Sequence, residues 1–281
     1  MKKIVLLFIG VAAFGLFVNA KMKGQFPDKI DFAGEEAPLH IPDVKERMDR
    51  ELVVNEFMHG STILILKRAN KVFPVIEPIL AKYNVPDDFK YLAVIESSLT
   101  NAVSSAGARG VWQFMPLTAK EKGLEVSETV DERYHLEKST EAACKYLVAA
   151  KERFGSWTMA AASYNGGLNG LQSQIDFQGV NNYYDLLLNE ETSRYVFRIL
   201  ALKEIMKNPA KYNFVLPQEE LYKKIPTRKI QVDSTVKDLA IFSKLQGINY
   251  KTLKYHNPWL RDRKLDNPTK KVYEIEIPEV K

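Results

Sequence analysis

The chain has 281 residues, of which 46% are hydrophobic and 27% charged, with a formal net charge of +5 and ordinary numbers of glycine and proline. This composition is typical of a globular protein with one large domain or two smaller ones, and it excludes collagen-like and low-complexity chains. The single cysteine, Cys144, excludes an intrachain disulfide framework and any multi-cysteine zinc or iron–sulfur site.

The first twenty residues differ from the rest of the chain. Lys2 and Lys3 precede an uncharged run over 4–18, and small residues follow up to Ala20. This pattern predicts a signal peptide and an exported protein of the periplasm or cell envelope. The run is shorter than the roughly 20 residues of a membrane-spanning helix, so we expect cleavage after Ala20, with an uncleaved N-terminal anchor as the alternative.

Basic charge is concentrated near the C-terminus, where residues 223–281 contain fourteen Lys or Arg and seven Asp or Glu. An exported protein meets anionic polymers and lipid surfaces of the envelope, not nucleic acid. The basic region therefore favours peripheral membrane association or contact with cell-wall polymers, and a solvated face without a partner is an equal alternative.

Helical periodicity dominates the first two thirds of the chain. The segments that show it are 42–58, 63–69, 75–83, 87–98, 139–154, 157–164 and 191–207. Pro86 suits the first turn of the helix over 87–98, and two aspartates follow it at the positive end of the helix dipole. The sequence predicts a mainly α fold.

Prolines interrupt the pattern between 208 and 226, and a different order follows: a strand at 229–232, helices at 236–245 and 250–255, and a strand at 272–278. We therefore divide the chain into a signal segment (1–20), an N-terminal helical segment (21–75), a helical domain (76–210), a linker (211–226) and a small α+β module (227–281).

Glu96 is the first candidate for chemistry. It lies on the apolar face of the helix over 87–98, four residues after Leu92, near the C-terminal end. Burial and the negative end of the helix dipole both raise the pKa of a carboxyl group, and a protonated carboxyl near neutral pH is what a general acid needs. A rim position or a pairing with a base is the structural alternative.

Two further segments carry residues suited to a carbohydrate. In the first, Trp112, Phe114 and Met115 offer apolar surface and Gln113 offers a donor and an acceptor; in the second, a small-residue helix ends at Tyr164–Asn165 before two glycines. A loop packed on the core and a simple helix stop are the alternatives. Neither 97–120 nor 155–175 contains an acid. A single acid suffices for glycoside cleavage if the substrate's own hydroxyl attacks, whereas hydrolysis ordinarily requires a second carboxylate.

Four motifs then identify a family resemblance: Glu96–Ser98, Gly107–Ala119, Ala162–Gly167 and Glu191–Val196. They resemble, in order and spacing, the motifs of soluble-lytic-transglycosylase domains in glycoside hydrolase family 23, and most of all the membrane-bound lytic murein transglycosylase D type. Gly110-Val111-Trp112-Gln113 replaces the Gly-Leu-Met-Gln of many members, a variant associated with the D type. The lipid anchor usual in that type needs a cysteine near the predicted cleavage point, where this sequence has none.

The resemblance implies a lysozyme-like helical fold and cleavage of the β-1,4 bond between N-acetylmuramic acid and N-acetylglucosamine in peptidoglycan. It implies that Glu96 is the catalytic acid and that the product is 1,6-anhydro-N-acetylmuramic acid. It also implies that peptidoglycan glycan strands are the partner and that no cofactor is needed. By the same resemblance the substrate-binding residues are Ser97, Gln113, Met115, Tyr164, Asn165 and Tyr195. A goose-type lysozyme-like hydrolase and a non-catalytic peptidoglycan-binding protein are the alternatives.

The C-terminal module resembles a LysM module, a small binder of N-acetylglucosamine chains, but Asp233-Ser234-Thr235 replaces the usual Gly-Asp-Thr. A structural appendage is the alternative to glycan binding. Tyr255 and Trp259 are candidates for stacking on sugars or for the module's core. The four histidines are scattered, which predicts no metal site. Asp131 and Arg133 are expected to form an ion pair in the loop before the helix over 139–154.

Overall fold

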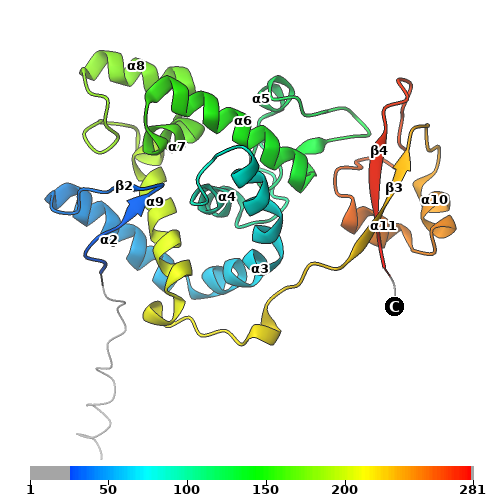
Figure 1. Ribbon diagram of the computed structural model, residues 1–281, viewed down its shortest axis with the longest axis horizontal. Helices are drawn as coiled ribbons and strands as arrows, with labels where there is room; N and C mark the ends of the chain where they lie inside the picture. Colours follow the sequence, from blue (N-terminus) through cyan, green and yellow to red (C-terminus); the bar gives the residue numbers. More distant parts are fainter. Residues whose placement is uncertain (1–25, 280–281) are drawn as a thin grey trace, which may run out of the picture.

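The structure, a computed structural model, describes residues 26–279, so the predicted signal peptide and its cleavage point lie outside the described residues. The helices of the main body are α2 (Pro42–Phe57), α3 (His59–Lys82), α4 (Phe89–Ser97), α5 (Pro116–Glu121), α6 (Leu136–Phe154), α7 (Trp157–Gly166), α8 (Leu168–Gln178) and α9 (Glu190–Lys207). A separate group of two strands and two helices follows (Figure 1). The predicted mainly α fold with a small α+β module is confirmed.

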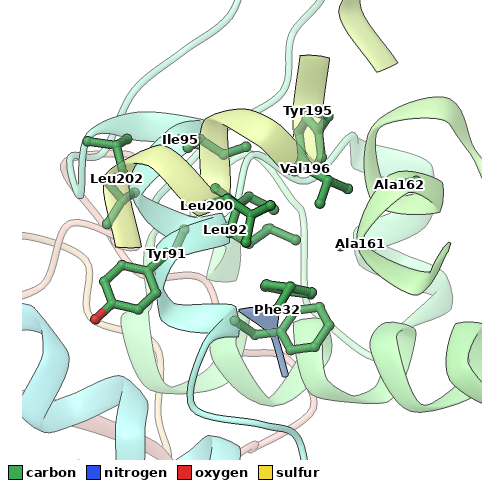
Figure 2. Packing of buried hydrophobic residues seen from close by; sticks show 14 of the residues in the cluster. Phe32, Tyr91, Leu92, Ile95, Ala161, Ala162, Tyr195, Val196, Leu200 and Leu202 are labelled. Carbon is green, nitrogen blue, oxygen red and sulfur yellow. The ribbon is translucent and has the colours of Figure 1, made fainter. Parts of the chain in front are cut away.

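Helix α9 is the centre of the helical body, where α2, α4 and α7 pack against it. Figure 2 shows Leu200 of this helix beside Leu92 of α4, and Val196 and Phe32 belong to the same hydrophobic cluster. Phe32 belongs to a short hairpin, β1 (Asp31–Phe32) and β2 (Glu35–Glu36), that the helical periodicity did not predict. The core therefore joins elements that are far apart in the sequence around α4, the helix that carries Glu96.

Helix α3 corrects a prediction, because the two helical segments expected at 63–69 and 75–83 form one continuous helix. Pro74 and Pro78 lie inside it, where each removes a backbone hydrogen bond. Both prolines are exposed. The buried stripe on the other side of the helix continues past them through Ile65, Ala69, Val72, Ile76 and Leu80. Packing of this stripe against α4 and α6 outweighs the interrupted bonds.

Helix α4 begins at Phe89, two residues later than expected, and Asp88, the residue before it, is held in a buried ion pair with Lys203. The Asp88 carboxylate accepts hydrogen bonds from Lys203 Nζ (2.6 Å) and from the backbone N–H of Ala33 (2.7 Å). Lys203 also donates to the carbonyl oxygen of Asp31 at 2.6 Å. One ammonium group thus ties the hairpin to α4 and α9. The sequence pattern also did not predict the helices α5 and α8.

Removing this ammonium group is expected to destabilise the protein strongly. Lys203→Ala leaves the buried Asp88 carboxylate without its counter-charge, and breaking such a pair from one side costs about 3–5 kcal/mol. Lys207→Ala, one turn further along α9 at an exposed position, is the matched control and should cost less than about 0.5 kcal/mol. Urea unfolding followed by circular dichroism measures both. Equal losses in the two variants would contradict the role of Lys203.

The C-terminal module consists of β3 (Thr227–Val232), α10 (Leu239–Leu245), α11 (Tyr250–His256) and β4 (Tyr273–Pro278). The strands pair antiparallel, with Thr227 opposite Pro278. Helix α10 begins three residues later than predicted because the Asp238 side chain caps it, accepting from the backbone N–H groups of Ala240 and Ile241. The strand–helix–helix–strand order is as predicted.

Trp259 belongs to the core of this module. It is 4% exposed and stacks on Tyr273 with a ring separation of 5.6 Å. Of its two predicted roles, the one in the module's core is therefore confirmed. Tyr255 is 63% exposed and remains accessible.

The module is docked on the helical body by strand-like contacts. The backbone N–H of Asp131 donates to the carbonyl oxygen of Trp259 (2.9 Å). The backbone N–H of Arg261 donates to the carbonyl oxygen of Thr129 (2.8 Å). Lys271 adds ion pairs with Glu125 (2.7 Å) and Glu132 (3.0 Å). Val130 and Tyr134 of the helical body are part of the module's own hydrophobic cluster. These contacts fix the module against the segment that precedes α6.

Candidate active site

Glu96 lies at the penultimate position of α4 and is bonded to α9. The hydroxyl of Tyr195, itself buried, donates a hydrogen bond to the Glu96 carboxyl. Burial raises the pKa of Glu96 to about 7, while the Tyr195 hydrogen bond and the charge of Arg198 lower this pKa and the charge of Glu191 raises it. The side chain keeps part of its exposure to solvent. This carboxyl can therefore hold a proton near neutral pH and still reach a ligand.

The backbone just after Glu96 adopts an unusual turn. Ser98 and Leu99 have left-handed φ values of 51° and 58°, which cost energy in residues with a side chain and are common at functional sites. The buried hydroxyl of Ser97 donates to the carbonyl oxygen of Val111 (2.8 Å), and Arg68 donates to that of Ser98 (3.2 Å). Ser97 thus supports the turn and points into the protein, not toward a ligand.

The loop of the second motif is clamped by Arg133. Its guanidinium binds Asp131 with two bonds (2.9 and 2.7 Å) and donates to the carbonyl oxygens of Gly107 and Phe114, both at 3.1 Å. The expected Asp131–Arg133 ion pair is confirmed, and it organises this loop as well as the segment before α6. Gly110 packs so tightly here that an added Cβ would lie 1.9 Å from the Arg133 carbonyl oxygen.

Gln113 lies within this loop in a left-handed conformation, φ 51°. Both N–H bonds of its side-chain amide are directed to loop carbonyls, at 2.7 Å to Gly110 and 3.1 Å to Ala102. Its carbonyl oxygen is therefore the group that can face a ligand, and that group accepts a hydrogen bond from a substrate N–H or O–H. Trp112 and Phe114 are buried, so the interpretation of these two rings as ligand surface is wrong. Met115, 42% exposed, remains on the surface.

Helix α7 brings the third motif to the same site. The hydroxyl of Tyr164 donates to the carbonyl oxygen of Trp112 (2.8 Å), next to Gln113. Burial, and next the negative charge of Glu96, raise the pKa of Tyr164, so the Glu96 and Tyr164 side chains are electrostatic neighbours. Asn165 is held between Glu191, to which it donates (2.8 Å), and the Thr192 hydroxyl, from which it accepts (2.8 Å). The fold thus brings together the side chains of Glu96, Tyr164 and Tyr195. Asn165 is connected to them through its hydrogen bonds with Glu191 and Thr192 of α9.

A cleft of about 480 Å³ opens beside the end of α4. Its lining includes Ile95, Ser98, Glu191, Arg194 and Arg198, which are sequence neighbours of Glu96 and Tyr195, but not Glu96 or Tyr195 themselves. Glu191 and Arg198 were not predicted as site residues. Helical spacing could have indicated both, since they lie four residues before and three after Tyr195 on the same face of α9. A second carboxylate therefore lies in the neighbourhood of Glu96.

Within residues 26–279 no group of three or more His, Cys, Asp or Glu side chains is placed to hold a metal ion. In the same part of the chain, none of the helices combines the length and the apolar character needed to cross a bilayer.

Comparison with known proteins bears directly on this site. Residues 74–186, which include Glu96, Gln113, Tyr164 and Asn165, match the family described as Transglycosylase SLT domain. This part of the chain, called the SLT domain below, is similar to that family. Residues 228–281 match the Soluble lytic transglycosylase C-terminal LysM-like domain, so the small module that docks beside the SLT domain is LysM-like. Tyr195 and Glu191 lie on α9, beyond the matched part of the SLT domain but in contact with it.

Two relatives resemble both the SLT domain and its neighbours. The proteins named Membrane-bound lytic murein transglycosylase D from Escherichia coli (strain K12) and from Escherichia coli O6:H1 (strain CFT073) are each 28% identical to this chain over 235 residues. The alignment covers 80% of this chain and 50% of each relative. The chain thus spans about half the length of these relatives.

Proposed function

We propose that this protein is a lytic transglycosylase that cleaves the β-1,4 bond between N-acetylmuramic acid and N-acetylglucosamine in peptidoglycan, within the cell envelope. The observation that carries the proposal is the carboxyl of Glu96, which lies within the part of the chain that matches the SLT domain, keeps part of its exposure to solvent and has its pKa raised to about 7 by burial. The similarity to relatives named for murein transglycosylase activity supports the choice of substrate.

In the proposed reaction, protonated Glu96 gives its proton to the glycosidic oxygen as the bond from this oxygen to C1 of the muramoyl sugar breaks. The carboxylate that remains then takes the proton from the C6 hydroxyl of the same sugar. The C6 oxygen closes onto C1 and forms the 1,6-anhydro product. The proton returns to Glu96, so the acid is regenerated and no water is consumed.

The neighbouring residues have distinct proposed roles. Tyr195 orients the Glu96 carboxyl through its hydrogen bond. The carbonyl oxygen of Gln113 accepts a hydrogen bond from a substrate N–H. The amide NH₂ of the same side chain already donates to the carbonyl oxygens of Ala102 and Gly110, so only the oxygen is available. Tyr164, Asn165 and Met115 line the bound sugar chain, and Ser97 supports the turn that follows the acid.

The mass and the oxygen-18 content of the released product distinguish this reaction from hydrolysis. Purified sacculi digested in water enriched in oxygen-18 are expected to release muropeptides that end in 1,6-anhydro-N-acetylmuramic acid. These products are lighter than the hydrolytic ones by one water and carry no heavy oxygen at C1. Mass spectrometry measures both properties. Reducing-end muramic acid labelled with oxygen-18 would contradict the proposal.

A goose-type lysozyme-like hydrolase is the second candidate, and Glu191 favours it. This carboxylate lies close enough to Glu96 to raise its pKa, and a second carboxylate is what hydrolysis uses to activate water. Against this role, Glu191 is exposed and already accepts a hydrogen bond from Asn165. A hydrolase would lose turnover in Glu191→Gln, whereas a transglycosylase would retain it.

A further inference from the structure

A second cavity, also of about 480 Å³, lies where the SLT domain, the linker and the LysM-like module meet. In Figure 1 the linker passes below α3 on its way to β3, and α11 lies on the side of the module that faces the helical body. The linker is held to α3 by the backbone N–H of Tyr222, which donates to the carbonyl oxygen of Lys67 (3.1 Å), and by the side-chain amide of Asn70, which donates to the carbonyl oxygen of Tyr222 (3.0 Å). These contacts give the interdomain groove a wall built from three parts of the chain.

The interdomain groove is rich in positive charge. The basic residues that line it are Arg68, Lys71, Lys223, Lys224 and Lys254, and the acidic ones are Glu137 and Glu276. Lys224 lies 3.8 Å from Glu137, which is also 3.3 Å from His135. Within residues 26–279 no ion pair is formed by the other four basic side chains. The groove therefore has cations in excess of the carboxylates that could neutralise them.

Lys254 shows this excess most clearly. Its ammonium group is half-buried and donates to the carbonyl oxygen of Asp262 (2.8 Å), which is a neutral partner. Burial, and next the charge of Arg261, lower the pKa of Lys254 to about 8. An anion placed in the groove would relieve this unfavourable environment, because an opposite charge at short range stabilises the charged form.

The interdomain groove is connected to the candidate active site through the chain. Leu99, Thr100 and Asn101, which follow the turn after Glu96, line it together with Val111, whose carbonyl oxygen accepts from Ser97. Ser98, one residue earlier, lines the cleft on the other side. The turn at the end of α4 therefore borders both spaces.

We propose that the interdomain groove binds the carboxylate-bearing peptide stem of the peptidoglycan strand whose glycan is bound at Glu96. This inference rests on the proposed function, since peptide stems branch from the muramoyl sugars of that substrate. The free carboxylates of the stem match the unpaired cations, and Val72 and Val75 offer apolar contact for its side chains. The volume is within the range of sites that hold small ligands.

Binding of the stem alone tests the groove without turnover. Isothermal titration calorimetry of the full chain with the free stem tetrapeptide is expected to show binding that weakens with added salt and is lost when the peptide carboxylates are amidated. Lys71→Gln and Lys254→Gln should each raise Kd about tenfold. Lys251→Gln, an exposed position on α11 outside the groove, is the matched control and should leave Kd as in the wild type. Absence of binding, or equal Kd values in all variants, would overturn the proposal.

Turnover separates this proposal from the proposed function. The ratio of kcat/KM on peptide-bearing strands to that on strands stripped of peptide by an amidase should fall about tenfold in Lys71→Gln and Lys254→Gln, but not in Lys251→Gln. If this ratio stays at the wild-type value while anhydro product is still formed, the proposed binding of the peptide stem in the groove is wrong, and the proposed reaction is unaffected. If the two groove variants lose peptide binding but the wild-type protein cleaves neither kind of strand, the proposed reaction is wrong, and the proposed binding of the peptide stem is unaffected.

Discussion

Glu96→Gln is expected to reduce kcat on purified sacculi by at least about a thousandfold at pH 6, because a positioned general acid contributes roughly 10²–10⁴ and this one also serves as the base of the second step. Glutamine keeps the shape and the hydrogen bond from Tyr195 but has no proton to give. Release of soluble muropeptides, followed by chromatography, measures the loss. Binding to sacculi should remain.

The same acid sets the pH dependence of the wild-type enzyme. With the pKa of Glu96 at about 7, the protonated form dominates below pH 7, and kcat/KM is expected to fall tenfold per pH unit above it. Tyr195→Phe removes the hydrogen bond that lowers this pKa and should move the alkaline limb to higher pH. Glu191→Gln removes a repulsive charge and should move it to lower pH.

The stability of the Glu96→Gln variant tests whether its loss of activity is caused by misfolding. Because the pKa of Glu96 is raised in the folded state, the native protein binds more protons than the unfolded chain between the pKa values of about 4.5 and 7, and stability falls as pH rises through that window. Ionised Glu96 thus costs on the order of 3 kcal/mol above pH 7. Glu96→Gln removes this cost, so the inactive variant should have the higher Tm at pH 8.

Two outcomes would contradict this account. Full activity in a well-folded Glu96→Gln variant would remove the assigned role of the acid. Wild-type protein that binds sacculi without releasing any muropeptide would indicate the non-catalytic peptidoglycan-binding alternative.

Gly110→Ala is expected to damage both stability and activity. The new Cβ would lie 1.9 Å from the Arg133 carbonyl oxygen, and φ at this position is +81°. Because the blocking atom is backbone and is held by the Arg133–Asp131 pair, it cannot rotate away. We expect a loss of about 3 kcal/mol or more. The displaced loop also carries Gln113, and a shift of about 1 Å at such a site costs roughly a hundredfold in kcat/KM.

Gly107→Ala is the matched control for Gly110→Ala. Gly107 also has a positive φ, +90°, but nothing lies within 4 Å of the position of its Cβ. It should lose only about 1 kcal/mol, the cost of the left-handed conformation alone. Urea unfolding and initial rates on the same substrate measure both variants. Similar losses at the two glycines would mean that the contact with Arg133 does not restrict the loop.

Sequence alone was sufficient wherever the determining interactions are local. Helical periodicity located most helices of the body, and the spacing from Leu92 placed Glu96 on the apolar face of α4, where burial does raise its pKa. The strand–helix–helix–strand order of the module followed from the same kind of pattern. Such signals are visible because one stretch of chain both forms the element and buries its own apolar face.

Tertiary structure decided which distant groups meet. Tyr195 lies 99 positions after Glu96, and Glu191 and Arg198 reach the acid only because α9 packs against α4. Packing also overrode two prolines in α3 and put Trp259, not Tyr255, into a core. The interdomain groove exists only because the module docks through the backbone of 129–131. These features depend on contacts whose energy comes from burial between separate elements, and local propensity carries no information about such contacts.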